Sequence, residues 1–258
     1  MIFMCMLRVV MFGTPAIYWN DNKVFFPFAK MEAVLYYLLV EGECTRDKLA
    51  MLLWGEKADQ DAKKNLRNTI YSIKKMISPE LFITPTRKMI SLNSKLIYAT
   101  DIELLNKSDV QDFLQKQSGD FLENFYCRDA ELVDDWVMAK RLEFKEIMIT
   151  RLTSGILNFI HNKQYTDAKK HIKQLIKIDE YNESAYRLLM KIYEREEAFY
   201  KVTETYHKLE KKWADELNLC PSNKTKEIYA RVAQQHKQRL DALEHITKFA
   251  RDLTIIWR

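Results

Sequence analysis

A repeat of 34 residues in the second half of the chain constrains the fold more than any other feature. Seven apolar or aromatic positions recur at this period: Leu152, Ile156, Phe159, Tyr165, Ala168, Ile172 and Leu175, then Tyr186, Met190, Tyr193, Phe199, Val202, Tyr206 and Leu209. The period is typical of tetratricopeptide repeats, in which helix pairs bury their apolar faces on one another. The sequence therefore predicts a small tetratricopeptide-like α-solenoid here.

The remaining helical patterns define the extent of this part of the chain. From Tyr98 onward the pattern is helical almost throughout, with short pieces at Asp101–Leu105 and Val110–Leu114 before a long helical region that ends near Ile160. Residues 241–258 also carry apolar residues at helical spacing, which predicts a C-terminal helical tail. The 258 residues, 47% of them hydrophobic, are enough for two domains with cores. We expect domains at residues 1–97 and 98–240, followed by the tail.

The first 97 residues have a different pattern, in which short apolar runs alternate with turn residues. Such runs are typical of a small sheet, and three helices and a hairpin follow them. The expected strands are Leu7–Phe12, Ala16–Trp19, Val24–Phe26, Leu81–Thr84 and Met89–Leu92, and the expected helices run from Lys30 towards Gly42, from Arg46 to Trp54 after an N-cap at Thr45, and from Ala62 to Ile77. A helix triad with a following basic hairpin predicts a winged helix-turn-helix preceded by a β-sheet. The expected class is therefore mainly α, with two domains.

The helix predicted from Ala62 to Ile77 has two different faces. Its apolar stripe is Leu66, Ile70, Ile73 and Ile77, and its outward face is Lys64, Asn68, Tyr71 and Lys75, with Arg67 on the flank. A helix of this kind can enter a major groove of DNA. The alternative is an ordinary solvated face rich in lysine.

The net charge favours the DNA interpretation. Residues 1–97 hold 14 Lys and Arg against 9 Asp and Glu, whereas residues 98–258 hold 27 of each kind. All of the excess positive charge therefore lies in the first domain. Such asymmetry indicates a polyanionic partner for that domain.

Several blocks of the sequence resemble SARP-type transcriptional activators, which combine an OmpR-type winged helix with a bacterial transcriptional activator domain. The blocks in the first domain are LRVVMFGTPAIYWNDNKVFF, KMEAVLYYLLVEGECTRDKLAMLLWGE and AKKNLRNTIYSIKKMI, and those in the second are NKQYTDAKKHIKQLIKIDEYNESAYRLLMKIYERE and KKWADELNLCPSNKTKEIY. They occur in the order of that family and cover about residues 7–235. The resemblance implies a cytoplasmic, sequence-specific activator that binds promoter direct repeats, pairs on DNA as a homodimer, and contacts RNA polymerase.

The resemblance also implies roles for single residues. Groove-facing candidates are Lys64, Arg67, Asn68, Tyr71 and Lys75; phosphate-contact candidates are Lys63 and Lys74; Thr45 and Arg46 would meet a phosphate through free backbone N–H groups and positive charge; and Arg87 and Lys88 belong to the wing. The loop Gly55–Gln60 corresponds to the polymerase-contacting segment of OmpR-type proteins, which makes Glu56, Lys57, Asp59 and Gln60 candidates for that contact. The competing hypothesis is a helical-repeat scaffold whose small first domain binds protein.

Enzymatic and membrane functions find no support in the sequence. The four cysteines lie far apart, no histidine has a nucleophile or zinc spacing, and no phosphate-binding GxxxxGK[ST] motif occurs. We therefore expect no catalysis, no cofactor, no metal and no ATPase activity. No stretch has the apolar length of a membrane span, and the apolar start of the chain is expected to be a strand rather than a signal peptide. The periodic tyrosines of the repeat are expected in the core rather than in a ligand cleft.

Overall fold

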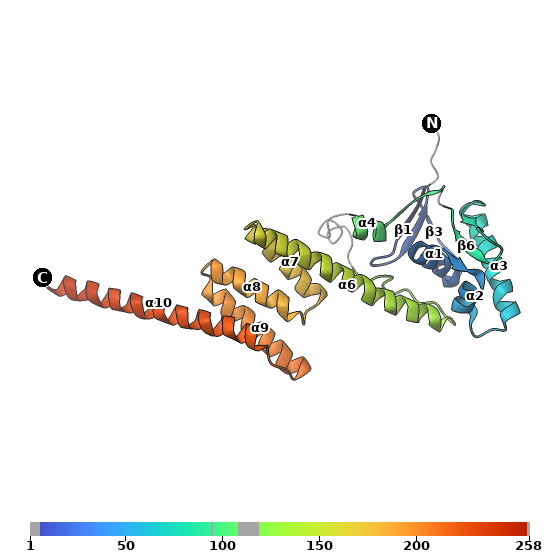
Figure 1. The fold of residues 1–258 in the computed structure, drawn as a ribbon. Helices are drawn as coiled ribbons and strands as arrows, with labels where there is room; N and C mark the ends of the chain where they lie inside the picture. The colour runs from blue at the N-terminus through green and yellow to red at the C-terminus, as the bar shows by residue number, and fades with distance from the viewer. Residues whose placement is uncertain (1–5, 94, 108–118, 257–258) are drawn as a thin grey trace, which may run out of the picture. The chain divides into compact units, whose positions relative to one another are not determined.

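The computed structural model describes residues 6–93, 95–107 and 119–256, with the backbone alone for residues 97, 98, 106, 107 and 244–256. It is mainly helical, with a small N-terminal sheet and a helical C-terminal part, as predicted (Figure 1). The chain divides into two compact units, residues 1–148 and 149–258. The expected piece Val110–Leu114 lies outside the described residues. The predicted domain boundary at 97/98 differs from this division and stays a prediction.

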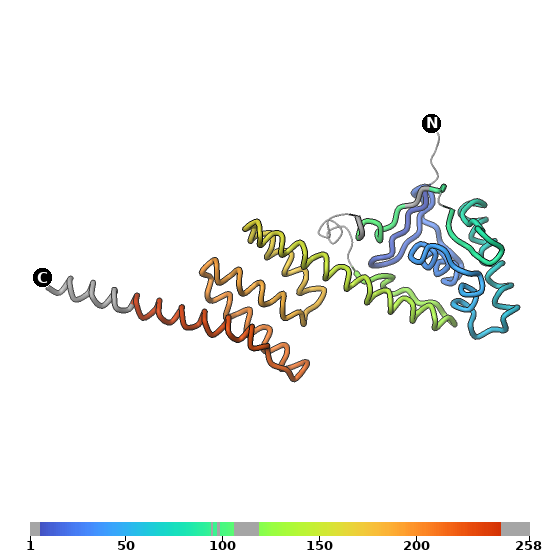
Figure 2. Tube along the Cα trace, viewed as in Figure 1, coloured from blue at the N-terminus to red at the C-terminus, as the bar shows by residue number. Residues whose placement is uncertain are grey.

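The first sheet has four strands in the order β3-β2-β1-β7. Figure 2 follows the course of the chain by its colour, from blue to red. Its strands are β1 (Met6–Val10), β2 (Ala16–Trp19), β3 (Asn22–Val24) and β7 (Ile97–Thr100). The turn before β3 has only two residues, Asn20 at φ 48° and Asp21 at φ 63°, a conformation that suits a tight hairpin. Because the turn is so short, β3 starts at Asn22, and the predicted strand Val24–Phe26 was wrong by two residues.

Strand β7 corrects the prediction that the chain is helical from Tyr98. It pairs in parallel with β1, and α4 (Asp101–Lys107) begins directly after it. One carboxylate oxygen of Asp101 accepts hydrogen bonds from the backbone N–H groups of Met11 (2.6 Å) and Phe12 (2.7 Å). Asp101 is 3% exposed, so this contact ties the end of β7 to the end of β1 within the core.

Three helices and a second sheet form the winged helix. The helices are α1 (Ala29–Glu41), α2 (Arg46–Trp54) and α3 (Asp59–Met76), and the strands are β4 (Cys44–Thr45), β5 (Phe82–Ile83) and β6 (Met89–Leu92) in the order β4-β6-β5. The Thr45 hydroxyl accepts a hydrogen bond from the Lys48 N–H at 3.1 Å, which confirms the predicted N-cap. Helix α3 begins three residues earlier than predicted, because Asp59 and Asp61 suit the positive end of a helix. Asp59 and Gln60 are therefore helical and not part of a loop.

Residues 119–148 complete the core of the first unit. Phe121 and Phe144 pack around Phe12, with ring centroids 5.9 and 5.4 Å from it. The Trp136 indole packs on Tyr37 and donates a hydrogen bond to Glu41 at 2.8 Å. The first half of α6 (Glu131–His161) thus covers the sheet and α1.

The second unit is built from helix pairs. It holds the end of α6, then α7 (Tyr165–Ile178), α8 (Glu183–Arg195), α9 (Phe199–Leu217) and α10 (Asn223–Ile256). Five of the seven repeated positions are buried in both copies, from Leu152 and Tyr186 to Leu175 and Leu209. Tyr186, Tyr193 and Tyr206 are 2%, 8% and 5% exposed, which places them in the core as predicted. The predicted C-terminal helix is present as the end of α10.

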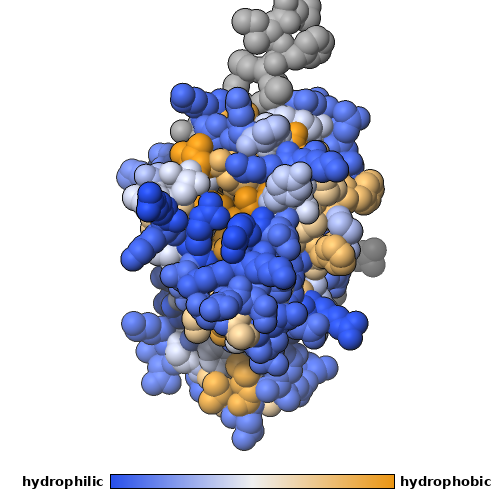
Figure 3. All heavy atoms as spheres, turned by 90° about the vertical axis from the view of Figure 1, so that its right-hand side faces the viewer, coloured by the Kyte–Doolittle hydropathy of each residue, from blue (hydrophilic) through white to orange (hydrophobic). Residues whose placement is uncertain are grey.

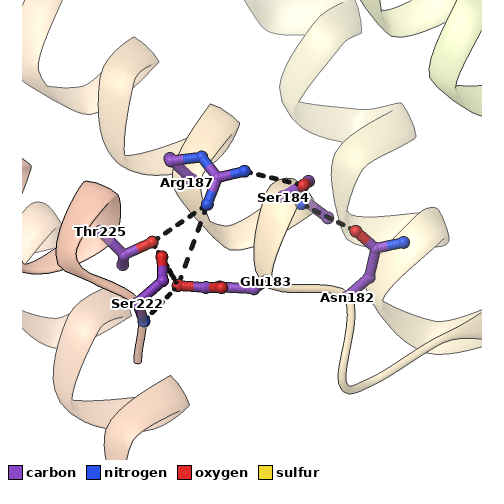
Figure 4. A network of polar contacts seen from close by, with 7 residues as sticks. Asn182, Glu183, Ser184, Arg187, Ser222 and Thr225 are labelled. Atoms are coloured by element: carbon purple, nitrogen blue, oxygen red, sulfur yellow. Dashed lines mark hydrogen bonds and ion pairs between the residues drawn. The ribbon is translucent and has the colours of Figure 1, made fainter. Parts of the chain in front are cut away.

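A polar network fixes the start of α10 to the start of α8 (Figure 4). One oxygen of the Glu183 carboxylate accepts hydrogen bonds from the Ser222 N–H (2.8 Å), the Ser222 hydroxyl (2.6 Å) and the Thr225 hydroxyl (2.6 Å). Arg187 lies 3.9 Å from the same oxygen. Burial raises the pKa of Glu183, but these hydrogen bonds and the guanidinium outweigh it, so the pKa is lowered overall.

Candidate nucleic-acid interface

Helix α3 presents the two faces that its sequence predicts. Leu66, Ile70, Ile73 and Ile77 are 2%, 6%, 0% and 8% exposed and anchor the helix to the core. Lys64, Arg67, Asn68, Tyr71 and Lys75 are all exposed, and Tyr71 is 70% exposed. A phenol held so far into solvent contributes little to the core. The outward face is therefore available to a partner.

A concave basic groove lies beside this face. It has a volume of about 330 Å³ and is lined by Arg46 and Asp47 from α2, Lys63, Leu66 and Arg67 from α3, and Arg87 and Lys88 from the hairpin. We call it the basic groove. The sequence predicted these five cations as candidates on three separate segments, and the fold brings them together. Figure 3 looks onto the side of α2 and α3, where most of the visible surface is hydrophilic.

Two hydrogen bonds hold the wing to the start of α2. The Arg46 N–H donates to the Lys88 carbonyl at 2.8 Å, and the Arg46 guanidinium donates to the Thr84 hydroxyl at 3.3 Å. These contacts bear on the predicted phosphate contact through free backbone N–H groups at this helix start, which stays a prediction. The N–H of Arg46 is used by the wing, and the N–H of Lys48 is used by Thr45. What Arg46 offers to an anion is its side-chain charge.

Lys63 differs from the other cations because two carboxylates hold it. Its ammonium lies 3.1 Å from Asp47 and 2.9 Å from Asp59. Hydrogen bonds to Asp59 and Asp47 raise the pKa of Lys63. Among the residues that the structure describes, no carboxylate lies within 4.0 Å of Lys64, Arg67, Lys74, Lys75, Arg87 or Lys88. The positive charge of the groove therefore comes mainly from its arginines and Lys88, while Asp47 places a negative charge among them.

Asn68 lies beside a different hollow. This second hollow has a volume of about 530 Å³ and is lined by Asn65, Asn68 and Thr69 of α3, by Phe28, Met31 and Trp54, and by Pro27, Ala29, Lys30, Arg128 and Asp129. Asn68 therefore borders this second hollow, whereas its neighbour Arg67 borders the basic groove.

The segment before α3 is exposed and charged. Glu56, Lys57, Asp59 and Gln60 are all exposed, and Asp59 is held by Lys63. Glu56 lies 3.9 Å from Lys30, whose ammonium also donates hydrogen bonds to the carbonyls of Leu53 (2.6 Å) and Asp129 (2.7 Å). The loop is Gly55–Ala58, and its residues are exposed, as are residues 59–61 at the start of α3.

One lining residue, Asp47, and one supporting residue, Thr84, were not predicted from the sequence as parts of the site. Asp47 enters the groove because Lys63 folds back onto it, and Thr84 supports Arg46 from the wing. The four-residue spacing of Asp59 and Lys63 does suggest a helical ion pair. Nothing local indicates the pairing of Lys63 with Asp47, which depends on how α2 packs against α3.

Comparisons with known proteins agree with this architecture. The model of the bacterial transcriptional activator domain family matches residues 114–233. Among solved structures, the chain resembles that of Mycobacterium tuberculosis EmbR in complex with a low-affinity phosphopeptide, with 16% identity and a TM-score of 0.67. The alignment covers 90% of this chain and 66% of that one. The comparison with curated proteins gave no match.

The matched domain and the shared fold confirm the resemblance to SARP-type proteins that the sequence indicated. The matched model covers residues 114–233, and the likeness to EmbR, at 16% identity, concerns the fold. No helix in the described part of the chain has the length and hydropathy needed to cross a membrane. Within the same residues, no group of His, Cys, Asp and Glu side chains could hold a metal ion.

Proposed function

We propose that this protein is a cytoplasmic, sequence-specific DNA-binding transcription activator. The single observation that carries the proposal is the basic groove, in which Arg46, Lys63, Arg67, Arg87 and Lys88 meet beside the exposed face of α3. Cations from two helices and a wing on one surface match the way winged helices follow a DNA backbone. The opposite face of α3 is buried in the core and holds the helix in place. The exposed face can therefore enter a major groove of DNA while the helix stays folded.

The residues divide by role. Lys64, Arg67, Asn68, Tyr71 and Lys75 face the base edges. Lys74 and the charges of Arg46, Arg87 and Lys88 contact phosphates, which position the protein without reading the sequence. Lys63 joins these phosphate contacts only to the extent that DNA displaces its two carboxylates, and the Thr45 hydroxyl acts through the cap of α2.

The DNA-binding function resides in residues 1–97, and residues 98–240 supply the surfaces for assembly, with residues 241–258 as a helical tail. The exposed segment of Glu56, Lys57, Asp59 and Gln60 contacts RNA polymerase. A single winged helix reads a short site, so two protomers bind direct repeats about one helical turn apart. Head-to-tail pairing uses two different surfaces of the protein. The protein can therefore be a monomer in solution and pair only when it is bound to DNA.

The test begins with genomic footprinting by the purified full chain, which supplies a duplex for anisotropy titrations. Lys64→Ala and Lys75→Ala should each weaken binding by about 1 kcal/mol and lower the salt slope by about one unit per lost phosphate contact. Lys95→Ala is the matched control, since Lys95 is exposed but lies outside α3 and outside the basic groove. If Lys64→Ala and Lys75→Ala behave like the control, the assignment of the exposed face of α3 to DNA is wrong.

The competing function is a protein-interaction scaffold whose first domain binds protein. Footprinting distinguishes the two, because a scaffold enriches no sequence and protects no duplex. Lys57→Ala separates the two contacts of an activator: it should retain DNA affinity and reduce transcription from a reconstituted promoter. A loss of DNA affinity instead would assign this segment to DNA.

A further inference from the structure

A second groove lies in the other unit, on the surface of α7, α8 and α9. Its volume is about 510 Å³, and its lining combines apolar and charged side chains. Tyr186, Leu189 and Tyr193 of α8 form an apolar floor. Lys173 and Lys177 line it from α7, and Lys201 and Lys208 line it from α9, with Glu204 as the acidic residue of the lining. We call it the lysine groove.

The four lysines lack the ion pairs that neighbouring lysines make. Lys169 of α7 is held by Glu196 at 2.6 Å, and Lys212 of α9 is held by Glu180 at 2.9 Å. For the lysines of the groove, the described residues provide no carboxylate within 4.0 Å. The Lys201 ammonium lies 5.4 Å from the ring centroid of Tyr193 and 5.6 Å from that of Tyr200. The groove concentrates positive charge in a unit that lies in the neutral part of the chain.

We propose that the lysine groove binds an extended acidic segment of a partner protein. Lys173 and Lys177 are one turn apart on α7, which is about 6 Å along the helix axis. Alternate side chains of an extended peptide are about 6.7 Å apart, so two carboxylates at i and i+2 match this pair. Lysines on the opposite wall can take the carboxylates that point the other way. Aliphatic side chains of the segment bury against Tyr186, Leu189 and Tyr193.

The apolar floor separates this partner from a nucleic acid. Phosphates would use the lysines but leave the apolar side chains that line the groove without a complement. The volume is in the range of sites that hold a drug-sized ligand, which corresponds to a few peptide residues. A cationic rim and an apolar base are therefore complementary to a short stretch of Asp or Glu with interspersed Leu.

The experiment is an anisotropy titration of the full chain with a labelled peptide of Asp and Glu with interspersed Leu. Its comparison peptide replaces each acid by the amide. The acidic peptide should bind at low salt, weaken as salt rises, and bind at least about tenfold more tightly than the amide peptide. Equal affinity for the two peptides would overturn the proposal.

Charge reversal then locates the site. Lys177→Glu with Lys208→Glu removes one cation from each wall and should weaken the acidic peptide about tenfold. The matched control, Lys170→Glu with Lys191→Glu, changes the charge equally at exposed lysines outside the groove and should stay within about twofold. Thermal melts by circular dichroism compare the folding of both variants. Equal losses in the two variants would show that net charge alone attracts the peptide.

Two further measurements separate this site from the basic groove. Peptide affinity should be unchanged in Arg67→Glu, because that residue lies in the first unit. Duplex DNA should leave the peptide bound. Displacement of the peptide by duplex, or its loss in Arg67→Glu, would place the acidic peptide in the basic groove and refute the proposal.

Discussion

Because two carboxylates hold Lys63, we expect that one substitution near the basic groove increases DNA affinity, whereas most substitutions there should decrease it. Asp47 lines the basic groove and holds Lys63 at 3.1 Å. On DNA, its negative charge would lie among the phosphates that the arginines and Lys88 attract. Removing that charge in Asp47→Asn should therefore increase DNA affinity.

The size of the gain follows from two effects. A carboxylate about 7 Å from one phosphate costs about 0.6 kcal/mol at the dielectric constant of water, and roughly twice that where DNA excludes half of the solvent. This repulsion alone corresponds to about a threefold to eightfold change in affinity. Lys63 is then held by Asp59 alone, at 2.9 Å, and becomes available to a phosphate. A full new phosphate contact would steepen the slope of the logarithm of the binding constant against the logarithm of salt concentration by about 0.9.

Asp61→Asn is the matched control. Asp61 is exposed and lies in the first turn of α3, but it neither lines the groove nor forms an ion pair among the described residues. Both substitutions remove one negative charge, and only Asp47→Asn releases Lys63. Anisotropy titrations at several salt concentrations compare them with the wild type. The reasoning is refuted if Asp47→Asn binds DNA no more tightly than Asp61→Asn, or if its salt slope is unchanged.

Three further predictions concern stability and assembly. Asp101→Ala leaves two buried N–H groups without an acceptor and should lower the free energy of unfolding in denaturant melts by about 2–4 kcal/mol. Asp101→Asn keeps an acceptor without a buried charge and should lower it far less. Equal losses in the two variants would contradict this role of Asp101. The lowered pKa of Glu183 contributes stability above the ordinary glutamate pKa of 4.5, and this stability is lost as pH falls through the lowered value. The melting temperature should therefore fall less on acidification in Glu183→Gln than in the wild type, and parallel curves would exclude this role for Glu183. Inserting five base pairs between half-sites should abolish cooperative DNA binding and ten should restore it, so unchanged affinity in every spacing would mean that protomers bind alone.

Elements whose signals are local were predicted well from the sequence. The apolar stripe of α3, the Thr45 cap and the 34-residue repeat each depend on residues within one or two helical turns or on a fixed period. Helix boundaries were less accurate, since α3 gains its first turn from acidic residues outside the apolar pattern. Local periodicity is therefore a good guide to which residues are buried and a weaker guide to where an element starts.

The contacts that were missed all join distant segments. Strand β7 is a short strand whose identity comes from pairing with β1, and β4 consists of two residues that pair with β6. No local pattern predicts either. The same reason applies in the candidate site, where the cations were identified but the Lys63–Asp47 pair and the hydrogen bond from Arg46 to Lys88 were not.

The tie between Asp101 and the end of β1 also sets an order of events during synthesis. Asp101 follows Met11 by 90 residues, and the Phe144 ring that packs on Phe12 follows later still. At about 5–20 residues per second, the ribosome needs several seconds to deliver β7 after β1 has emerged. During this interval the edge of β1 that β7 will cover is open and can pair with other nascent chains. Production of this protein should accordingly depend on chaperones that shield strand edges, even though its helices form quickly.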